Sequence, residues 1–149
     1  MTIEHSQEIA APIRTVWGLT VDVAAWVEIN PNVVGAECLD ETELRAGSRV
    51  RIRQRGLRPK VWTVVVHDPP HRFSWTTRLL WLTMTATHEL EATESGTRNT
   101  LRLELTGPGA GGVGRLLKGP LEAALAAEND GFKRAAETDT PSSSGPPRG

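Results

Sequence analysis

Hydrophobic and polar residues alternate over most of the chain between residues 3 and 106. Around residue 50, for example, Val50 and Ile52 are separated by Arg49, Arg51 and Arg53. A period of two residues places the apolar side chains on one face of a β-strand. Turn residues interrupt this alternation at intervals. We therefore predict seven strands, at residues 3–9, 33–40, 48–54, 61–67, 72–78, 83–91 and 101–105.

Three segments have helical spacing instead. Pro12 ends the first strand, and Val16 and Trp17 then follow the period of a short helix. A second short helix ends near Glu28. A long helix follows the glycines at 107–112, because one stripe of it is apolar. The stripe consists of Val113, Leu117, Leu121, Ala124, Leu125, Phe132 and Ala135.

The order of these segments predicts an α+β fold. An antiparallel sheet with one apolar face needs a cover, and the long C-terminal helix can supply it. The length of 149 residues suits one domain, which we expect to span residues 1–137. Residues 138–149 are rich in Ser, Pro and Gly, and we expect them to form a disordered tail.

Composition and charge exclude several classes of protein. Seventeen basic and 18 acidic residues give a net charge of −1, which argues against nucleic-acid binding. Cys38 is the one cysteine, so neither an internal disulfide nor a cysteine-based zinc site is expected. No apolar stretch is long enough for stable membrane insertion, and the N-terminus does not resemble a signal peptide. We therefore expect a cytoplasmic protein without metal or cofactor.

Several short patterns point to a known family. They occur in the order IAAP at 9–12, VW at 16–17, W at 26 followed by NP at 30–31, DPPHRF at 68–73, HEL at 88–90, GT at 96–97, LTG at 105–107 and NDGFKRAAE at 129–137. Together, over residues 3–137, they resemble the SRPBCC superfamily of START-like, polyketide cyclase and lipid-transport proteins. The resemblance implies a helix-grip fold, in which a curved seven-stranded antiparallel sheet wraps around the long C-terminal helix and two short helices follow the first strand.

In the helix-grip fold, a cavity lies between the concave face of the sheet and the long helix. The resemblance therefore implies that the inward-facing residues bind a ligand. These residues are Val50, Ile52, Gln54, Phe73, Trp75, Met84, Ala86, His88, Leu101, Leu103 and Ala124. Such a lining would accept a small hydrophobic molecule that a few polar groups orient. The alternative is an ordinary filled core made of the same residues.

Three titratable residues, His5, His88 and Glu128, interrupt the apolar faces. His88 lies between Ala86 and Leu90 on a predicted strand, and Glu128 falls within the apolar stripe of the long helix. His88 and Glu128 are candidates for an acid–base pair. Alternatively, His88 is a core histidine with a satisfied hydrogen bond and Glu128 lies in water beyond the sheet. His5 has the same two interpretations as His88, and it is the other possible partner of Glu128.

Two surface features have open interpretations. Arg49, Arg51, Arg53 and Arg55 form a basic row that either steers an acidic partner or is simply solvated. Residues 79–82 (LLWL) form an apolar run at a predicted hairpin. Exposed, this run would be a portal lip, a dimer contact or a membrane-touching patch; otherwise its residues are buried alternately.

Three functions are consistent with these observations. The first is binding of a small hydrophobic ligand such as a lipid, polyketide or aromatic metabolite. The second is a polyketide cyclase or dehydrase, and the sequence leaves open whether the protein is an enzyme. The third is a protein-interaction domain with a filled core. The partner expected under the first two is a small hydrophobic molecule, and a homodimer is left open.

Overall fold

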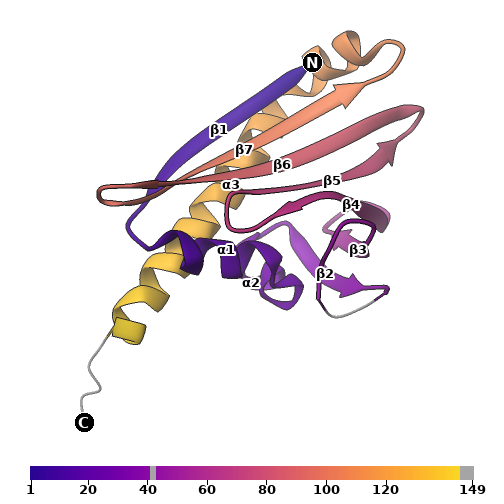
Figure 1. Ribbon diagram of the computed structural model, residues 1–149. Coiled ribbons are helices and arrows are strands. Elements are labelled where there is room, and N and C mark those ends of the chain that lie inside the picture. The colour runs from indigo at the N-terminus through magenta and orange to yellow at the C-terminus, as the bar shows by residue number, and fades with distance from the viewer. Residues whose placement is uncertain (41–42, 145–149) are drawn as a thin grey trace.

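The structure is a computed structural model that describes residues 1–40 and 43–144, with side chains to Thr138. Three α-helices and a short 3₁₀ helix join seven strands (Figure 1). The elements are β1 (Thr2–Ile9), α1 (Ile13–Val21), η1 (Val23–Ala25), α2 (Trp26–Ile29), β2 (Val33–Cys38), β3 (Arg49–Gln54), β4 (Lys60–Asp68), β5 (Arg72–Leu79), β6 (Leu82–Thr93), β7 (Gly96–Thr106) and α3 (Ala110–Ser144).

All strands pair antiparallel in one sheet with the order β1-β7-β6-β5-β4-β3-β2. After β1, the chain passes through α1 and α2 to the far edge of the sheet. Hairpins then return it strand by strand until β7 pairs with β1, with Ile3 opposite Leu103. The predicted α+β class and helix-grip topology are confirmed. Register shifts near Gly35 and Val66 mark irregularities of the kind that bend a sheet.

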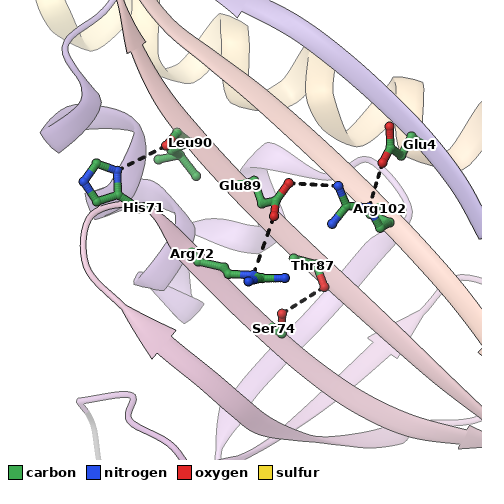
Figure 2. A network of polar contacts seen from close by, with 8 residues as sticks. All are labelled: Glu4, His71, Arg72, Ser74, Thr87, Glu89, Leu90 and Arg102. Carbon is green, nitrogen blue, oxygen red and sulfur yellow. Dashed lines mark hydrogen bonds and ion pairs between the residues drawn. The ribbon is translucent and has the colours of Figure 1, made fainter.

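The outer face of the sheet carries a chain of ion pairs across four strands (Figure 2). Arg102 of β7 donates to Glu4 of β1 at 2.7 Å and to Glu89 of β6 at 2.9 Å. Glu89 also lies 3.6 Å from the guanidinium of Arg72 on β5. Exposed pairs of this kind contribute about 0–1 kcal/mol each, so they support the strand register rather than the core.

Three arginines of the predicted basic row, Arg49, Arg51 and Arg53, lie on β3, and Arg55 lies in the turn that follows it. Arg49 pairs with Asp40 at 2.9 Å and Arg51 pairs with Glu37 at 3.1 Å. These pairs join β3 to β2 and the residues that follow it. They favour the solvated-face interpretation of the row over a docking site for an acidic partner.

The helix α3 runs across the inner face of the sheet, behind β1, β7 and β6 in Figure 1. Its backbone packs against β1 and β7, and against α1 and α2. Two groups of buried side chains fill the space beneath it. The aromatic cluster contains Trp26, Phe73, Trp75, His88 and Phe132. The aliphatic cluster contains Ile3, Leu82, Met84, Leu101, Leu103, Leu105, Ala110 and Leu125.

The run at residues 79–82 is partly buried and partly exposed. Leu79 and Leu82 pair at the end of the β5–β6 hairpin, and Leu82 is fully buried. Leu80 and Trp81 form the turn and are 72% and 56% exposed. The two flanking leucines are buried wholly or in part and the two turn residues are exposed, so burial does not alternate along this run.

The helix α3 ends later than the sequence predicts. Its backbone remains helical to Ser144, so the predicted domain end at residue 137 falls inside the helix. Residues 145–149 of the predicted tail lie outside the described residues. Among the described helices, none is both long and apolar enough to cross a membrane.

A close backbone contact fixes how α2 meets α3. Gly131 of α3 is buried, and a Cβ atom added there would overlap the carbonyl oxygen of Ile29 in α2. The obstacle is backbone rather than a flexible side chain, so it cannot move without displacing α2. Glycine at this position therefore allows the approach of the two helices.

We predict that Gly131→Ala destabilises the protein by roughly 3 kcal/mol, the upper end of the range for overpacked positions. Urea unfolding monitored by circular dichroism measures the change. The matched control is Gly112→Ala, because Gly112 lies in the same helix with open space around it. There alanine should raise stability by up to about 1 kcal/mol through helix propensity. Equal effects of the two substitutions would contradict the packing argument.

Candidate functional site

A carboxyl group and an imidazole meet beneath α3. Glu128 of α3 places its Oε2 atom 3.6 Å from Nε2 of His88 on β6. The His88 side chain is 2% exposed and the Glu128 side chain is 15% exposed. The structure thus brings together two of the three residues that interrupt the apolar faces, although they lie 40 positions apart in the sequence.

Aromatic rings surround the imidazole. The ring centroids of Trp26, Phe73 and Phe132 lie 5.5, 5.9 and 5.7 Å from that of His88. Each of these rings meets the imidazole at a steep interplanar angle. Such surroundings solvate a charge poorly, so they favour the neutral form of any group among them.

Burial shifts the pKa values of the two groups in opposite directions. It raises the pKa of Glu128 from 4.5 to about 8 and lowers the pKa of His88 from 6.5 to about 3. At pH 7 the pair therefore consists of a neutral carboxylic acid and a neutral imidazole. The 3.6 Å separation exceeds a normal hydrogen bond, so the Glu128 proton is not committed to the imidazole.

Asn30 holds the other oxygen of the carboxyl group. Its Nδ2 donates to Oε1 of Glu128 at 3.3 Å, and its own Oδ1 accepts the backbone N–H of Asn32 at 3.0 Å. The sequence predicts a turn at residues 30–32 but gives no role to the Asn30 side chain. The Asn-Pro-Asn pattern signals the turn, whereas the reach of the amide to α3 depends on the tertiary fold.

The Nδ1 atom of His88 has no hydrogen-bond partner among the described residues, and it is buried. Nearly all buried polar atoms in proteins are paired, so an unpaired one calls for an explanation. If the proton is on Nε2, Nδ1 is an unpaired acceptor, the less costly arrangement for a buried imidazole.

The residue after Glu128 belongs to a separate polar network. Asn129 is fully buried and accepts a hydrogen bond from Asn99 of β7 at 2.8 Å. Its Nδ2 lies 3.0 Å from Nδ1 of His5 and donates to the carbonyl oxygens of His5 and Asn99 at 3.1 Å. His5 therefore helps to anchor α3 to β1. Its partner is Asn129, whereas the partner of His88 is Glu128.

The predicted ligand-binding residues fall into three groups. Val50, Ile52, Phe73, Trp75 and His88 are buried at the aromatic end of the interior, and Met84, Leu101 and Leu103 are buried in the aliphatic cluster. Ala86, Gln54 and Ala124 are only partly buried. Ala86 packs against both groups of buried residues.

Side chains already fill the surroundings of Trp75. Its ring lies 5.1 Å from Phe73, 5.2 Å from Trp26 and 5.5 Å from Trp62, measured between centroids. Trp75 is 4% exposed, so a ligand could reach it only by displacing another ring. This part of the interior agrees with the filled-core alternative.

Partly exposed apolar side chains occur next to that stack. On the sheet they are Trp62 and Ala86, which pack against both clusters, and on α3 Leu121 packs against the aliphatic cluster. Ala124 of α3 is also partly exposed. Glu128 continues the same side of the helix one turn after Ala124. The sequence does not single out Trp62, because residues 61–66 are nearly all apolar and their alternation does not reveal which face is inward.

Other features of the structure lie away from this pair. An open groove of about 470 Å³ is lined by residues of β4, β5 and β6, including Lys60, Thr76 and Arg78, and it does not include His88 or Glu128. Within the part of the chain that the structure describes, no three His, Cys, Asp or Glu side chains group closely enough to hold a metal ion.

Comparison with known proteins gives both a family and a fold. The family model described as "Polyketide cyclase / dehydrase and lipid transport" matches residues 1–137. A comparison with curated proteins finds no significant sequence match. The protein TTHA0849 from Thermus thermophilus is similar in structure, with a TM-score of 0.74 and 18% identity over 94% of this chain and 99% of that chain.

Two further structures are ARO/CYC proteins with two domains. StfQ, from the steffimycin biosynthetic pathway, has a TM-score of 0.76 and 15% identity, and the match covers 93% of this chain and 51% of StfQ. BexL, from the BE-7585A pathway, has a TM-score of 0.69 and 25% identity, with 92% of this chain and 46% of BexL covered. This chain thus spans about half the length of each.

The pKa shifts predict how stability depends on pH. The folded state retains the Glu128 proton up to about pH 8, whereas the unfolded carboxyl group loses its proton near pH 4.5. Glu128 therefore lowers the free energy of unfolding of the protein as pH rises from 4.5 to 8. His88 acts oppositely between about 3 and 6.5, because only the unfolded state takes up a proton there. The two effects offset each other between 4.5 and 6.5, and Glu128 alone acts above 6.5.

We therefore expect the free energy of unfolding to fall by about 2 kcal/mol between pH 6.5 and 8. Glu128→Gln should abolish this fall, because the amide is neutral throughout and can still accept the hydrogen bond from Asn30. Urea unfolding at a series of pH values measures it. The matched control is Glu122→Gln, an exposed position on the same helix, which should keep the wild-type slope. A slope that Glu128→Gln leaves unchanged would refute the assignment.

Proposed function

The chain belongs to the polyketide cyclase/dehydrase and lipid transport family, and on that premise we propose that it binds a small, mostly apolar molecule between α3 and the central strands. The observation that carries the proposal is the Glu128–His88 pair, 3.6 Å apart and largely buried, next to partly exposed apolar side chains. A surface that is apolar along its length and polar at one inner point is typical of ligand sites.

The apolar contacts would supply most of the affinity. Trp62 and Ala86 on the sheet face, with Leu121 and Ala124 on the helix, retain exposed apolar surface that a ligand can cover. Each Å² of apolar surface removed from water contributes about 25 cal/mol before the entropic cost of binding. The ring of Trp62 packs on Trp75 at 5.5 Å and offers a platform for a flat molecule.

Glu128 would orient the ligand. As a neutral acid it can donate its proton to a carbonyl or hydroxyl oxygen, while Asn30 holds its Oε1 atom. A charged ligand group is disfavoured at this point, because the surroundings already keep both titratable groups neutral. The preferred ligand is therefore neutral and apolar, with an oxygen atom near one end.

Cyclase or dehydrase chemistry is the second candidate, and the same pair favours it. In an aldol cyclisation a base removes the proton between two carbonyl groups, and an acid protonates the carbonyl oxygen under attack. The neutral Glu128 offers the acid function at pH 7, and the proton between the two carbonyl groups would be lost to water. Glu128 is the more exposed of the two and would contact the substrate, whereas His88 would act through Glu128 as a positioning residue.

The ligand proposal is tested by filling the space beside the helix. Ala124→Leu adds three carbons at a partly buried position, whereas Ala123→Leu adds them at an exposed neighbour. We expect Ala124→Leu to weaken binding of aromatic and lipid-like probes about tenfold or more, and Ala123→Leu to bind as the wild type does. Trp fluorescence titration, together with mass spectrometry of compounds that copurify, measures binding. Unfolding curves confirm that both variants fold.

If no probe binds the wild type saturably and no apolar compound copurifies, the ligand proposal fails. The ring packing around Trp75 would then support the interaction domain with a filled core.

The enzyme candidate is tested with a poly-β-keto thioester mimic and product analysis. If Glu128 is the acid, Glu128→Gln should lower kcat about a hundredfold or more while the dissociation constant of the mimic stays within a few-fold. Wild-type kcat should decline above about pH 8, where the carboxyl group ionises. Saturable binding of the mimic without turnover by the wild type would instead leave the protein a binding module.

A further inference from the structure

Highly exposed apolar side chains occur at one end of the sheet. The β3–β4, β5–β6 and β7–α3 connections all lie at this end, because β4 begins and β5 and β7 finish there. Figure 1 shows the β5–β6 and β7–α3 turns together. These segments carry Leu57, Leu80 and Trp81, which are 59%, 72% and 56% exposed. Leu116, in the second turn of α3, is 81% exposed.

The conformation of Leu80 is unfavourable for its residue type. Leu80 has φ = 59° in a two-residue turn between Leu79 and Leu82. Glycine or asparagine adopts this region readily, whereas a leucine pays a steric penalty. Next to it, Trp81 donates from Nε1 to the carbonyl oxygen of Pro108 at 2.7 Å, which fixes the position of its ring. The turn therefore holds two large apolar side chains in water at a cost in local stability.

Basic residues accompany the apolar ones. They are Arg55, Arg58, Lys60, Arg78, Arg115 and Lys118. Across residues 55–60, 78–83 and 104–118, Glu104 is the one acidic residue. Within the described part of the chain, none of the six basic side chains forms an ion pair, in contrast to Arg49 and Arg51. This end is thus strongly positive although the whole chain has a net charge of −1.

A groove lies beside the β5–β6 turn, because Arg78 and Thr83, which flank that turn, line it. It has a volume of about 470 Å³, and its lining combines Lys60 and Arg78 with hydroxyl groups of Thr63, Thr76 and Thr83. Ammonium, guanidinium and hydroxyl groups together suit a phosphate oxygen. The groove adjoins the exposed apolar turns, so an anionic headgroup bound there would leave its acyl chains beside Leu80 and Trp81.

We propose that this end of the protein docks on the surface of a bilayer that contains anionic lipids. Leu57, Leu80 and Trp81 enter the interfacial layer, and Lys60 and Arg78 contact the headgroups. A second copy of the chain is a poor occupant, because two such ends would bring their basic side chains face to face. Docking is peripheral and requires no spanning segment.

Vesicle cosedimentation tests the proposal on the full chain without added ligand. The protein should sediment with vesicles of phosphatidylcholine mixed with phosphatidylglycerol, and not with phosphatidylcholine alone. Two variants should each weaken this binding about tenfold or more: Leu57→Ser combined with Leu80→Asn, and Lys60→Gln combined with Arg78→Gln. Asparagine tolerates the conformation of Leu80, so the first variant keeps the turn. Fluorescence quenching by brominated lipids should identify Trp81 as the inserted tryptophan.

The matched control is Arg14→Gln combined with Arg134→Gln, which removes equal charge from exposed positions on α1 and late α3. It should bind vesicles as the wild type does. Failure of the wild type to bind anionic vesicles would overturn the proposal and leave this end to an acidic protein partner. Equal losses in the control and the Lys60/Arg78 variant would also overturn it, because binding would then follow net charge alone. Neither result bears on the ligand proposal, which concerns the opposite face of the sheet.

Discussion

The rotation of α3 about its own axis determines the interior of this protein, and a buried amide fixes that rotation. Asn129 is fully buried and bonds to both Asn99 and the backbone of β1. Turning the helix would leave these polar groups unpaired in the core, at about 1–3 kcal/mol for each. Gly131, two positions later, lets the backbone of α3 lie directly against the carbonyl oxygen of Ile29. The polar contacts and the backbone contact therefore specify one orientation.

Once that orientation is set, Glu128 has to face the sheet. It directly precedes Asn129, and the rotation that buries the amide turns the carboxyl group toward His88. Burying an ionised carboxylate without a cationic partner is costly, so the proton stays on Glu128. His88, inside a ring of aromatic side chains, stays neutral for the same reason. The neutral state of the pair is thus a consequence of how the helix is anchored.

Much of this architecture is predictable from the sequence, because it depends on periodicity. Clean alternation around Val50 and Phe73 locates the strands, and polar interruptions of apolar faces identify His88 and Glu128. The role of Asn30 is not predictable, since its partner is 98 positions away and an amide in a turn satisfies local needs equally well. Trp62 is missed because its strand is apolar on both sides. Periodicity reports which face a residue occupies and not how tightly that face is packed, so it could not show that the rings around Trp75 already touch.

The two proposals converge on the first residues of β4. Val61 and Thr63 line the outer groove, and alternation along the strand turns Trp62, which lies between them, to the inner face. One short segment therefore contributes to the basic, apolar end and to the partly exposed surface beneath α3. Transfer of an apolar molecule from a bilayer into water is unfavourable. A protein that binds such a molecule avoids this free-energy cost if its docking surface adjoins its binding surface. Here they are separated by the thickness of a single strand.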